Sequence, residues 1–260
     1  MTKDTCYLIR RPSVNVAYIY VPRDEEHKRW AYRFILSITH HRSAFPFKFT
    51  VICNGPNFDG QDVFAPVGKY DVFYHDDTGW DIGGYIAFAK SCREDILYCM
   101  GGTSYVQHSL WLERMIEAWC KHGPGFLGSL ATYEVRPHLN TSGFCVDPHL
   151  LAAYPLPVTN KQQRYEFEHG YNSFWLFCAR SEFPTLHVTR CGEYAWHDWR
   201  LPPNIYRRGD QSNLLTLFRH TDNYMVADPA LRRGMEGLAD TITDTRFQGW
   251  VGPSLPPSLR

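Results

Sequence analysis

The sequence has no excess of charge of either sign. Its 260 residues include 27 Lys and Arg and 27 Asp and Glu, so the formal net charge is zero with neutral histidine, and the pI is near 7.2. Proteins that bind nucleic acids rely on a basic surface that neutralises phosphates. The composition therefore excludes electrostatic binding of polyanions and predicts no nucleic-acid partner.

Long hydrophobic runs are also missing. No stretch reaches the roughly 20 apolar residues that a membrane-spanning helix needs. The chain opens with residues 1–5, which lack the apolar core of a signal peptide. We therefore expect a soluble, cytoplasmic protein, for which peripheral association with a membrane stays open. Hydrophobic residues at 44% and aromatic residues at 15% exclude a disordered chain.

The cysteines form no Cys-x-x-Cys pair, which is the spacing typical of zinc ribbons and redox motifs. Several of them lie within apolar runs such as 96–100. This pattern favours reduced thiols in the core over a disulfide framework or a zinc site. The residues concerned are Cys6, Cys53, Cys92, Cys99, Cys120, Cys145, Cys178 and Cys191.

Strands alternate with helices through the first half of the chain. Periodicity predicts strands at 14–21, 47–53, 70–75 and 96–100. It also predicts a helix capped by Asp24, a second helix that begins at Gly83, and a third with an apolar face over 112–119. Such alternation predicts a mostly parallel sheet with helices on both faces, which binds ligands outside the carboxyl ends of its strands. The polar loops at 54–56, 76–84 and 101–104 share that edge.

The second half is less regular. We expect a strand over 126–133, a short helix capped by Asp147, a helix striped over 171–178 and a strand over 186–189. The segment 207–212 is expected to begin a helix with Asp210 as its cap. Beyond about residue 228 the pattern fades, and 253–260 is expected to be a tail.

Several of these segments together resemble the GT-A-type glycosyltransferases, which transfer a sugar from a nucleotide sugar. The strand order and the polar turn after the second strand are two of the similar features. The similar segments are Trp80-Asp81-Ile82-Gly83-Gly84, Asn140-Thr141-Ser142-Gly143-Phe144 and Glu166-Phe167-Glu168-His169. The resemblance covers roughly residues 14–200. It implies a single α/β domain over 1–260, with a mixed, mostly parallel central sheet flanked by helices. It also implies a nucleotide-binding half at 14–105, an acceptor half at 106–228 and a tail at 229–260.

The resemblance also assigns roles to residues. Glu168, and less directly Glu166, matches the catalytic base of inverting members. Asn54, Asp81 and Gly83 match the donor site of the family. Their neighbours on the polar loops, Asp77, Gly101, Gly102 and Thr103, are further candidate donor contacts. The small-residue loop with Asn140 and Ser142 matches the acceptor site. The grouping of Trp196 and Trp199 around His197 and Asp198 suits an acceptor pocket, since sugars bind aromatic faces and carboxylates.

The sequence departs from the family where an Asp-x-Asp motif would hold a divalent ion, because Gly101-Gly102-Thr103 follows the fourth strand instead. A hard cation prefers carboxylate oxygens, so Mg²⁺ or Mn²⁺ is disfavoured and no metal ligand is assigned. Other groups would then neutralise a leaving diphosphate, and the candidates are Arg136, His138, Arg207 and Arg208. If a metal is required, the alternative ligands are Glu168, His169, His197 and Asp198.

Most of these segments also have a purely structural interpretation. Residues 76–79 form a turn in many proteins, and 101–102 is typical of a tight turn. Carboxylates such as Glu168 are common near a helix amino terminus, and the tryptophan grouping also suits the edge of a core. Two functions stay open. One is metal-independent transfer of a sugar to a glycan or glycolipid, as in making a surface polysaccharide. The alternative is a catalytically silent GT-A-like domain that binds a nucleotide, a glycan or a protein.

Overall fold

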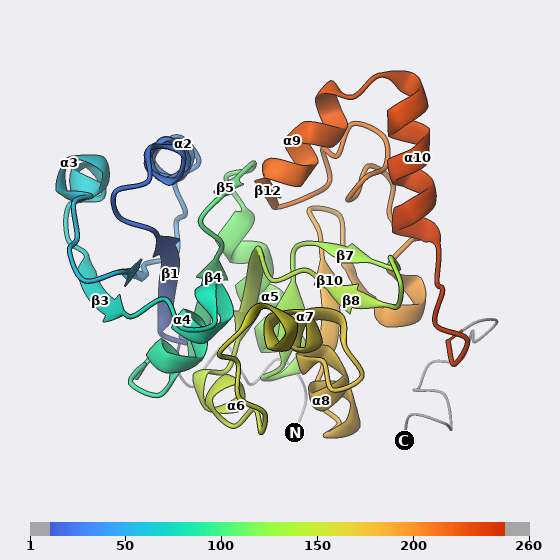
Figure 1. Ribbon diagram of the computed structural model, residues 1–260, viewed down its shortest axis with the longest axis horizontal. Coiled ribbons are helices and arrows are strands. Elements are labelled where there is room, and N and C mark those ends of the chain that lie inside the picture. The colour runs from blue at the N-terminus through green and yellow to red at the C-terminus, as the bar shows by residue number, and fades with distance from the viewer. Residues whose placement is uncertain (1–10, 248–260) are drawn as a thin grey trace.

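The computed structural model describes residues 11–247, and its centre is an eight-stranded sheet in the order β11-β10-β6-β9-β4-β1-β2-β3 (Figure 1). The parallel part consists of β1 (Val14–Tyr20), β2 (Lys48–Asn54), β3 (Asp71–His75) and β4 (Ile96–Met100). β9 (Gly143–Val146) is antiparallel to both β4 and β6 (Phe126–Gly128), so β6 runs in the direction of β4. β10 (Thr185–Val188) is parallel to β6, and β11 (Glu193–Ala195) closes the edge as an antiparallel strand. The predicted α/β class is confirmed.

Helices cover both faces of this sheet because side chains alternate along its buried strands. In β1, Val16 and Tyr18 face one core cluster, whereas Ala17 and Ile19 face the other. The first face packs against α2 (Glu25–His40), α3 (Gln61–Phe64) and α5 (Trp111–His122). The second packs against α4 (Trp80–Ala89), α6 (Pro148–Ala152), α7 (Lys161–His169) and α8 (Phe174–Arg180). Tyr18 stacks on Phe34 of α2 with ring centroids 4.3 Å apart, which joins a helix to the sheet.

Two predicted helix caps are confirmed. Asp24 lies before α2, and its Oδ1 accepts hydrogen bonds from the backbone N–H groups of Glu26 and His27. Asp147 caps α6 in the same way, by accepting from the N–H of His149. Each cap satisfies amide groups that the first helical turn leaves without a partner.

Several expected boundaries are wrong. The strand expected over 126–133 ends at Gly128, and β7 (Ala131–Thr132) pairs instead with β8 (His138–Leu139). The helix expected to open at Gly83 begins at Trp80, after the chain turns at Gly79 with a φ of 76°. The segment 207–212 is a turn and not a helix start, because no helix directly follows Asp210, although its carboxylate accepts from the N–H of Ser212 as a cap would.

The region beyond residue 228, expected to lose its pattern, continues as a helix. A small sheet of β5 (Ser104–Val106) and β12 (Thr216–Phe218) leads into α9 (Arg219–Val226) and then α10 (Pro229–Asp240), which form a hairpin beside the main sheet (Figure 1). Asp228 caps α10 and Pro229 occupies its first turn. The expectations for residues 1–5 and 253–260 lie outside the described residues. Over residues 11–247, no helix is long and apolar enough to cross a membrane.

Most of the cysteines lie in the core, as predicted. Cys53, Cys92, Cys99, Cys145 and Cys178 are buried, whereas Cys191 is exposed, and none of these six has a disulfide partner within the described chain. Burial raises the pKa of the Cys53 thiol to about 11. This thiol therefore stays protonated at neutral pH and is no nucleophile, although it directly precedes Asn54.

Candidate active site

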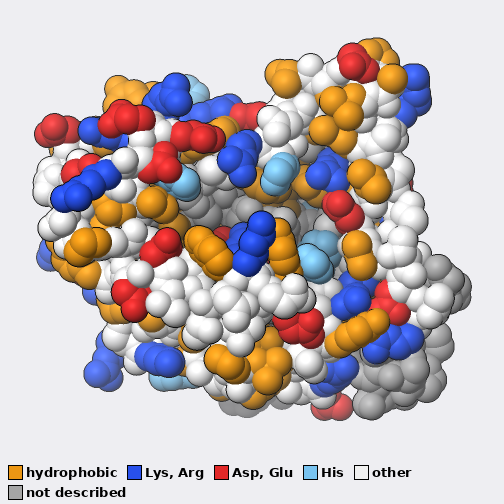
Figure 2. Space-filling model, in the orientation of Figure 1, with side chains coloured by type: hydrophobic (Ala, Val, Ile, Leu, Met, Phe, Trp, Pro, Cys, Tyr) orange, Lys and Arg blue, Asp and Glu red, His pale blue; other side chains and the backbone are white. Residues whose placement is uncertain are grey.

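A cavity of about 570 Å³ opens at the carboxyl edge of the sheet, where β1 and β4 lie side by side. After β1 the chain builds β2 and β3 on one side, and only then places β4 on the other. Loops that leave β1 and β4 therefore diverge and leave a crevice, which is where open α/β sheets bind ligands. Figure 2 shows the molecule hollowed near its centre with basic and histidine side chains around the hollow.

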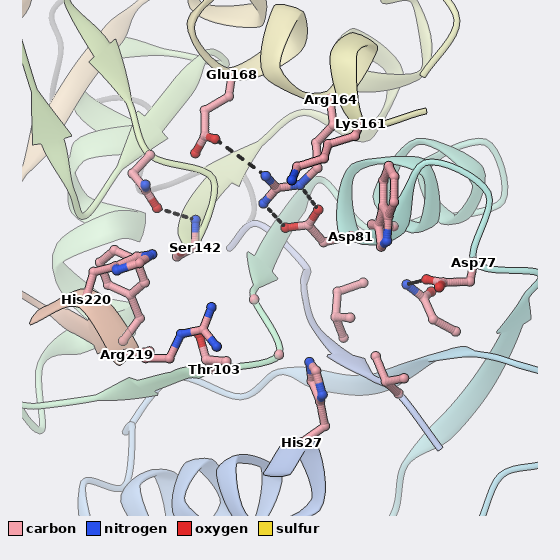
Figure 3. Close-up of a pocket in the computed structure, with 18 of the residues that line it drawn as sticks. His27, Asp77, Asp81, Thr103, Ser142, Lys161, Arg164, Glu168, Arg219 and His220 are labelled. Carbon is pink, nitrogen blue, oxygen red and sulfur yellow. Dashed lines mark hydrogen bonds and ion pairs between the residues drawn. The ribbon is translucent and has the colours of Figure 1, made fainter. Parts of the chain in front are cut away.

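The cavity brings together residues that the sequence predicted from both halves of the chain (Figure 3). Nine predicted residues line it, namely Asn54, Asp77, Asp81, Gly101, Gly102, Thr103, Asn140, Ser142 and Glu168. Its volume lies in the range of roughly 300 to 1,000 Å³ that is usual for small-molecule and cofactor sites. The roles assigned to these residues stay predictions, but their convergence defines a candidate active site.

Asn54 and Asp77 form one end of the cavity. Asn54 is the last residue of β2, and its Nδ2 donates to Asp77 Oδ1 at 2.8 Å. Asp77 adopts a left-handed φ of 66°, and burial raises the pKa of its carboxyl group above the usual value. Trp80 also lines this end with an exposed ring, which the sequence analysis noted only as part of a turn. An amide, a carboxyl and an aromatic face suit a planar, hydrogen-bonding base.

Replacing Asp77 with asparagine is expected to raise the melting temperature at about pH 7 by roughly 1 to 3 °C. Because the folded-state pKa is raised, ionisation of Asp77 costs stability as pH rises through that pKa, whereas the protonated form carries no such cost. Asparagine has no charge, can still accept from Asn54, and tolerates the left-handed backbone. Thermal unfolding at about pH 7 and about pH 3 tests this: a gain at low pH as large as that at neutral pH would contradict it.

Asp81, Arg164 and Glu168 form a chain of charges across the cavity. Arg164 donates from Nε to Asp81 Oδ1 at 2.6 Å and from Nη2 to Asp81 Oδ2 at 3.0 Å. Its Nη1 lies 3.9 Å from Glu168 Oε2, one helical turn further along α7. The Asp81 carboxylate raises the pKa of Arg164, which stays charged. Asp81 therefore orients Arg164, and Arg164 faces the predicted base (Figure 3).

Glu168 is held firmly by loop 140–142. Its Oε1 accepts hydrogen bonds from the backbone N–H and the hydroxyl of Thr141, at 3.2 and 3.0 Å. Only 10% of the side chain is exposed, and Figure 3 shows its carboxylate directed toward the cavity. Loop 140–142, expected from the resemblance to contact the acceptor, thus fixes the orientation of this carboxylate.

The loop after β4 forms the floor of the cavity. Ser104 N–H donates to the Gly101 carbonyl at 2.9 Å, so 101–104 is the tight turn that the structural interpretation expected. A Cβ at Gly102 would lie 3.1 Å from the His27 ring and 3.2 Å from the Ile19 carbonyl. Residue 102 is the middle position of the Asp-x-Asp frame. At its first position, a Cβ on Gly101 would lie 3.1 Å from Ser104 Oγ and 3.3 Å from Ser142 Cα, so the turn leaves little room there for a carboxylate.

Several cationic side chains of the cavity were not predicted from the sequence. Lys161, Arg164 and Arg219 line the cavity together with His27 and His220. Arg219 is half exposed, and its Nη1 lies 3.5 Å from Glu26 Oε1. Burial and the neighbouring Arg219 lower the pKa of His220, which is therefore neutral at pH 7 and supplies hydrogen bonds rather than charge.

Other predicted donor-site residues do not line the cavity. Gly83 is buried where a Cβ would lie 1.9 Å from the Thr78 carbonyl, so its role is close packing. Arg207 pairs with Glu134 at 2.8 Å. Arg208 contacts Asp240 at 3.1 Å. The two arginines are therefore engaged outside the cavity. Arg136 is also engaged elsewhere, because it pairs with Asp244. His138 is buried and contacts the Arg136 carbonyl.

The predicted acceptor group at 196–198 also lies elsewhere. Trp196 and Trp199 are buried in the second core cluster, where both pack against Trp175. His197 pairs with Asp198 at 3.2 Å in the short 3₁₀ helix η3 (Trp196–Asp198). The burial of both tryptophans supports the interpretation as a core edge, and the acceptor role stays a prediction. Glu166 likewise faces away, because its Oε1 accepts from the backbone N–H of Asn172.

The oxygen ligands that the cavity offers do not fit Mg²⁺ or Mn²⁺. The three carboxylates that line it, Asp77, Asp81 and Glu168, are each engaged by a neighbouring side chain. The alternative set of Glu168, His169, His197 and Asp198 is wrong, because residues 11–247 hold no group of three His, Cys, Asp or Glu side chains arranged to bind a metal. A hard cation prefers several free oxygen ligands at one point, and these residues do not supply them.

The fold is GT-A-like, as comparison with solved structures confirms. The chain is similar to the mannosyltransferase PcManGT from Pyrobaculum calidifontis, solved in complex with GDP-Man and Mn²⁺. The TM-score is 0.50 at 10% identity, over 74% of this chain and 61% of that one. No family model and no curated protein matches the sequence.

Two further structures show weaker similarity. One is glucosyl-3-phosphoglycerate synthase from Mycobacterium tuberculosis in complex with Mn²⁺, UDP and glucosyl-3-phosphoglycerate. Its TM-score is 0.41 at 10% identity, over 57% of this chain and 60% of that one. The other is CMP:2-keto-3-deoxy-manno-octonic acid synthetase complexed with CTP, with a TM-score of 0.42 at 9% identity, over 58% and 81%. The chain spans about three fifths of the length of PcManGT and of glucosyl-3-phosphoglycerate synthase.

Proposed function

We propose that this protein is a glycosyltransferase that moves a sugar from a nucleotide sugar to a glycan or glycolipid hydroxyl, with inversion and without a metal ion. One observation carries the proposal. The cavity between the ends of β1 and β4 has a polar end, formed by Asn54 and Asp77, that is the size of a nucleobase. The same cavity contains the carboxylate of Glu168, which comes from the other half of the chain and is held by hydrogen bonds. The GT-A-like fold supports this assignment.

In the proposed reaction, Glu168 accepts the proton of the acceptor hydroxyl as that oxygen attacks the anomeric carbon. The bond from the anomeric carbon to the diphosphate oxygen breaks, and the nucleoside diphosphate leaves. Thr141 and Arg164 hold the base in place, so that its geometry is set before the substrates meet. Asn54, Asp77 and Trp80 are proposed to hold the nucleobase.

In this proposal Arg219 and Lys161 neutralise the negative charge that develops on the leaving diphosphate. They take the role that the sequence suggested for Arg207 and Arg208. Replacing Arg219 with alanine is expected to lower turnover by roughly 30-fold to 1,000-fold, the usual loss for one charge-assisted contact to a leaving group. Turnover of the unaltered protein should survive EDTA. Initial rates with and without EDTA and added Mn²⁺ measure both effects.

Arg208→Ala is the matched control for this prediction, since Arg208 contacts Asp240 and lies outside the cavity lining. Its rate should stay within about threefold of the unaltered protein. Loss of turnover with EDTA and recovery with Mn²⁺ would show that a metal ion carries the charge and that the assignment to Arg219 is wrong.

A panel of UDP, GDP, dTDP and CMP sugars tests the function itself. Slow hydrolysis of one donor, together with a rise in melting temperature, is the expected result. The missing Asp-x-Asp motif favours a second candidate, a catalytically silent domain that binds a nucleotide or glycan. A thermal shift without any hydrolysis or transfer would support that candidate, whereas no shift with any donor would point to a domain that binds only protein.

A further inference from the structure

The hairpin of α9 and α10 ends in an exposed apolar tip. Val226, the last residue of α9, is 84% exposed, and Leu231 in the first turns of α10 is 53% exposed. Met225 beside them is 40% exposed. Figure 2 shows hydrophobic side chains gathered over this hairpin, at the upper right of the view. Apolar side chains grouped at a protruding tip signal a surface that meets an apolar phase or a partner.

The hairpin carries a small positive charge at its tip, where residues 225–233 hold Arg232 and Arg233 against one carboxylate, Asp228. Three of its acidic side chains are engaged within the protein, since Asp222 pairs with Arg33, Glu236 accepts from Tyr224 and Asp240 pairs with Arg208. The fourth, Asp228, caps α10 by accepting from the N–H groups of residues 230 and 231.

The arginines of α10 pair with no carboxylate among residues 11–247. Arg233 is exposed and makes no ion pair with any other described residue. Arg232 donates to the carbonyl of Met225, so its charge lies at the tip itself without a carboxylate partner. An apolar tip followed directly by two arginines matches the surface of an anionic bilayer, in which apolar groups enter the acyl boundary and cations contact the head groups.

The same helix connects the tip to the cavity. Arg219 and His220, the first residues of α9, line the cavity, and Val226 ends that helix. At 1.5 Å per residue the two points are about 10 Å apart along the helix axis. A bilayer that touches the tip would therefore lie close enough for a lipid head group to reach the cavity.

We infer that the α9–α10 tip docks the protein on anionic membrane surfaces, and that the acceptor is carried by a lipid in that surface. The docking stands on the tip alone, whereas the lipid-borne acceptor rests on the proposed transferase function. The contact is peripheral and reversible, because two or three apolar side chains and two cations form a small anchor.

Sedimentation with vesicles tests the docking. The full chain is incubated with phosphatidylcholine vesicles and with vesicles in which a quarter of the lipid is phosphatidylglycerol, and the pelleted fraction is measured at low and high salt. We expect binding to the anionic vesicles that salt weakens. Val226→Glu and Leu231→Glu should each lower the partition coefficient about tenfold. Arg233→Glu should weaken binding to anionic vesicles only.

Leu110→Glu is the matched control, since Leu110 is 54% exposed at the start of α5 and distant in the chain from the hairpin. It should bind vesicles like the unaltered protein, and equal melting temperatures should show that all variants fold. Failure of the unaltered protein to pellet with anionic vesicles would overturn the proposal. So would a dimer in solution that Val226→Glu dissociates, because the tip would then be an interface between copies. Vesicle binding without sugar transfer would leave the docking intact and count against the transferase.

Discussion

Replacing Glu168 with glutamine is expected to lower sugar-transfer turnover by roughly 100-fold to 10,000-fold, the usual contribution of a general base. Glutamine has the same shape, and its Oε1 can still accept from the N–H and hydroxyl of Thr141. Fold stability and donor affinity should therefore change little, so that the loss appears in kcat rather than in donor binding. Initial rates and calorimetric titration of the donor separate these two effects.

Glu166→Gln is the control for that experiment. It lies on the same helix, two residues earlier, but its carboxylate caps the N–H of Asn172 and does not line the cavity. Turnover should remain close to that of the unaltered protein. If Glu166→Gln removes activity and Glu168→Gln does not, the base has been assigned to the wrong carboxylate.

Replacing Arg164 with alanine is expected to impair both stability and turnover. It leaves the Asp81 carboxylate, which is 18% exposed, without its bidentate partner. Removing one partner of a fully buried pair costs about 3 to 5 kcal/mol, and a surface pair is worth less than about 1. The partial exposure of this pair predicts a loss near 2 kcal/mol in the free energy of unfolding. Urea denaturation measures it.

A double variant separates the two roles of Arg164. Asp81→Asn combined with Arg164→Met removes the stranded charge, so most of the stability should return. Turnover should stay low, because methionine cannot orient Glu168. Recovery of turnover along with stability would show that Arg164 contributes to the fold alone.

Residues at strand ends could be predicted from the sequence because buried strands have a clear period and a clear end. Asn54 ends β2, and 101–103 follow β4, so the parallel sheet brings both to one edge. Glu168 came from the resemblance alone. Arg164 was missed, although it lies one helical turn before Glu168, a spacing at which side chains of opposite charge commonly meet.

Other parts of the site depend on contacts that no local pattern reports. Arg219 and His220 follow β12, a three-residue strand that pairs only with β5 and shows no period of its own. The group at 196–198 has a composition that suits both a sugar pocket and a core edge, and only the fold shows that Trp196 is buried. Arg207 adopts a left-handed φ of 53° in a turn, where helix periodicity gives no guidance.

Hydrogen–deuterium exchange with and without a bound nucleotide tests the central claim most directly, namely that the cavity at the β1–β4 switch point binds a sugar nucleotide. The nucleotide is the one that raises the melting temperature most among UDP, GDP, dTDP and CMP. We predict slower amide exchange in peptides that cover 54–56, 77–84 and 101–104, with the α9–α10 tip unchanged. Protection confined to another surface, or no protection with any nucleotide at saturating concentration, would contradict the claim.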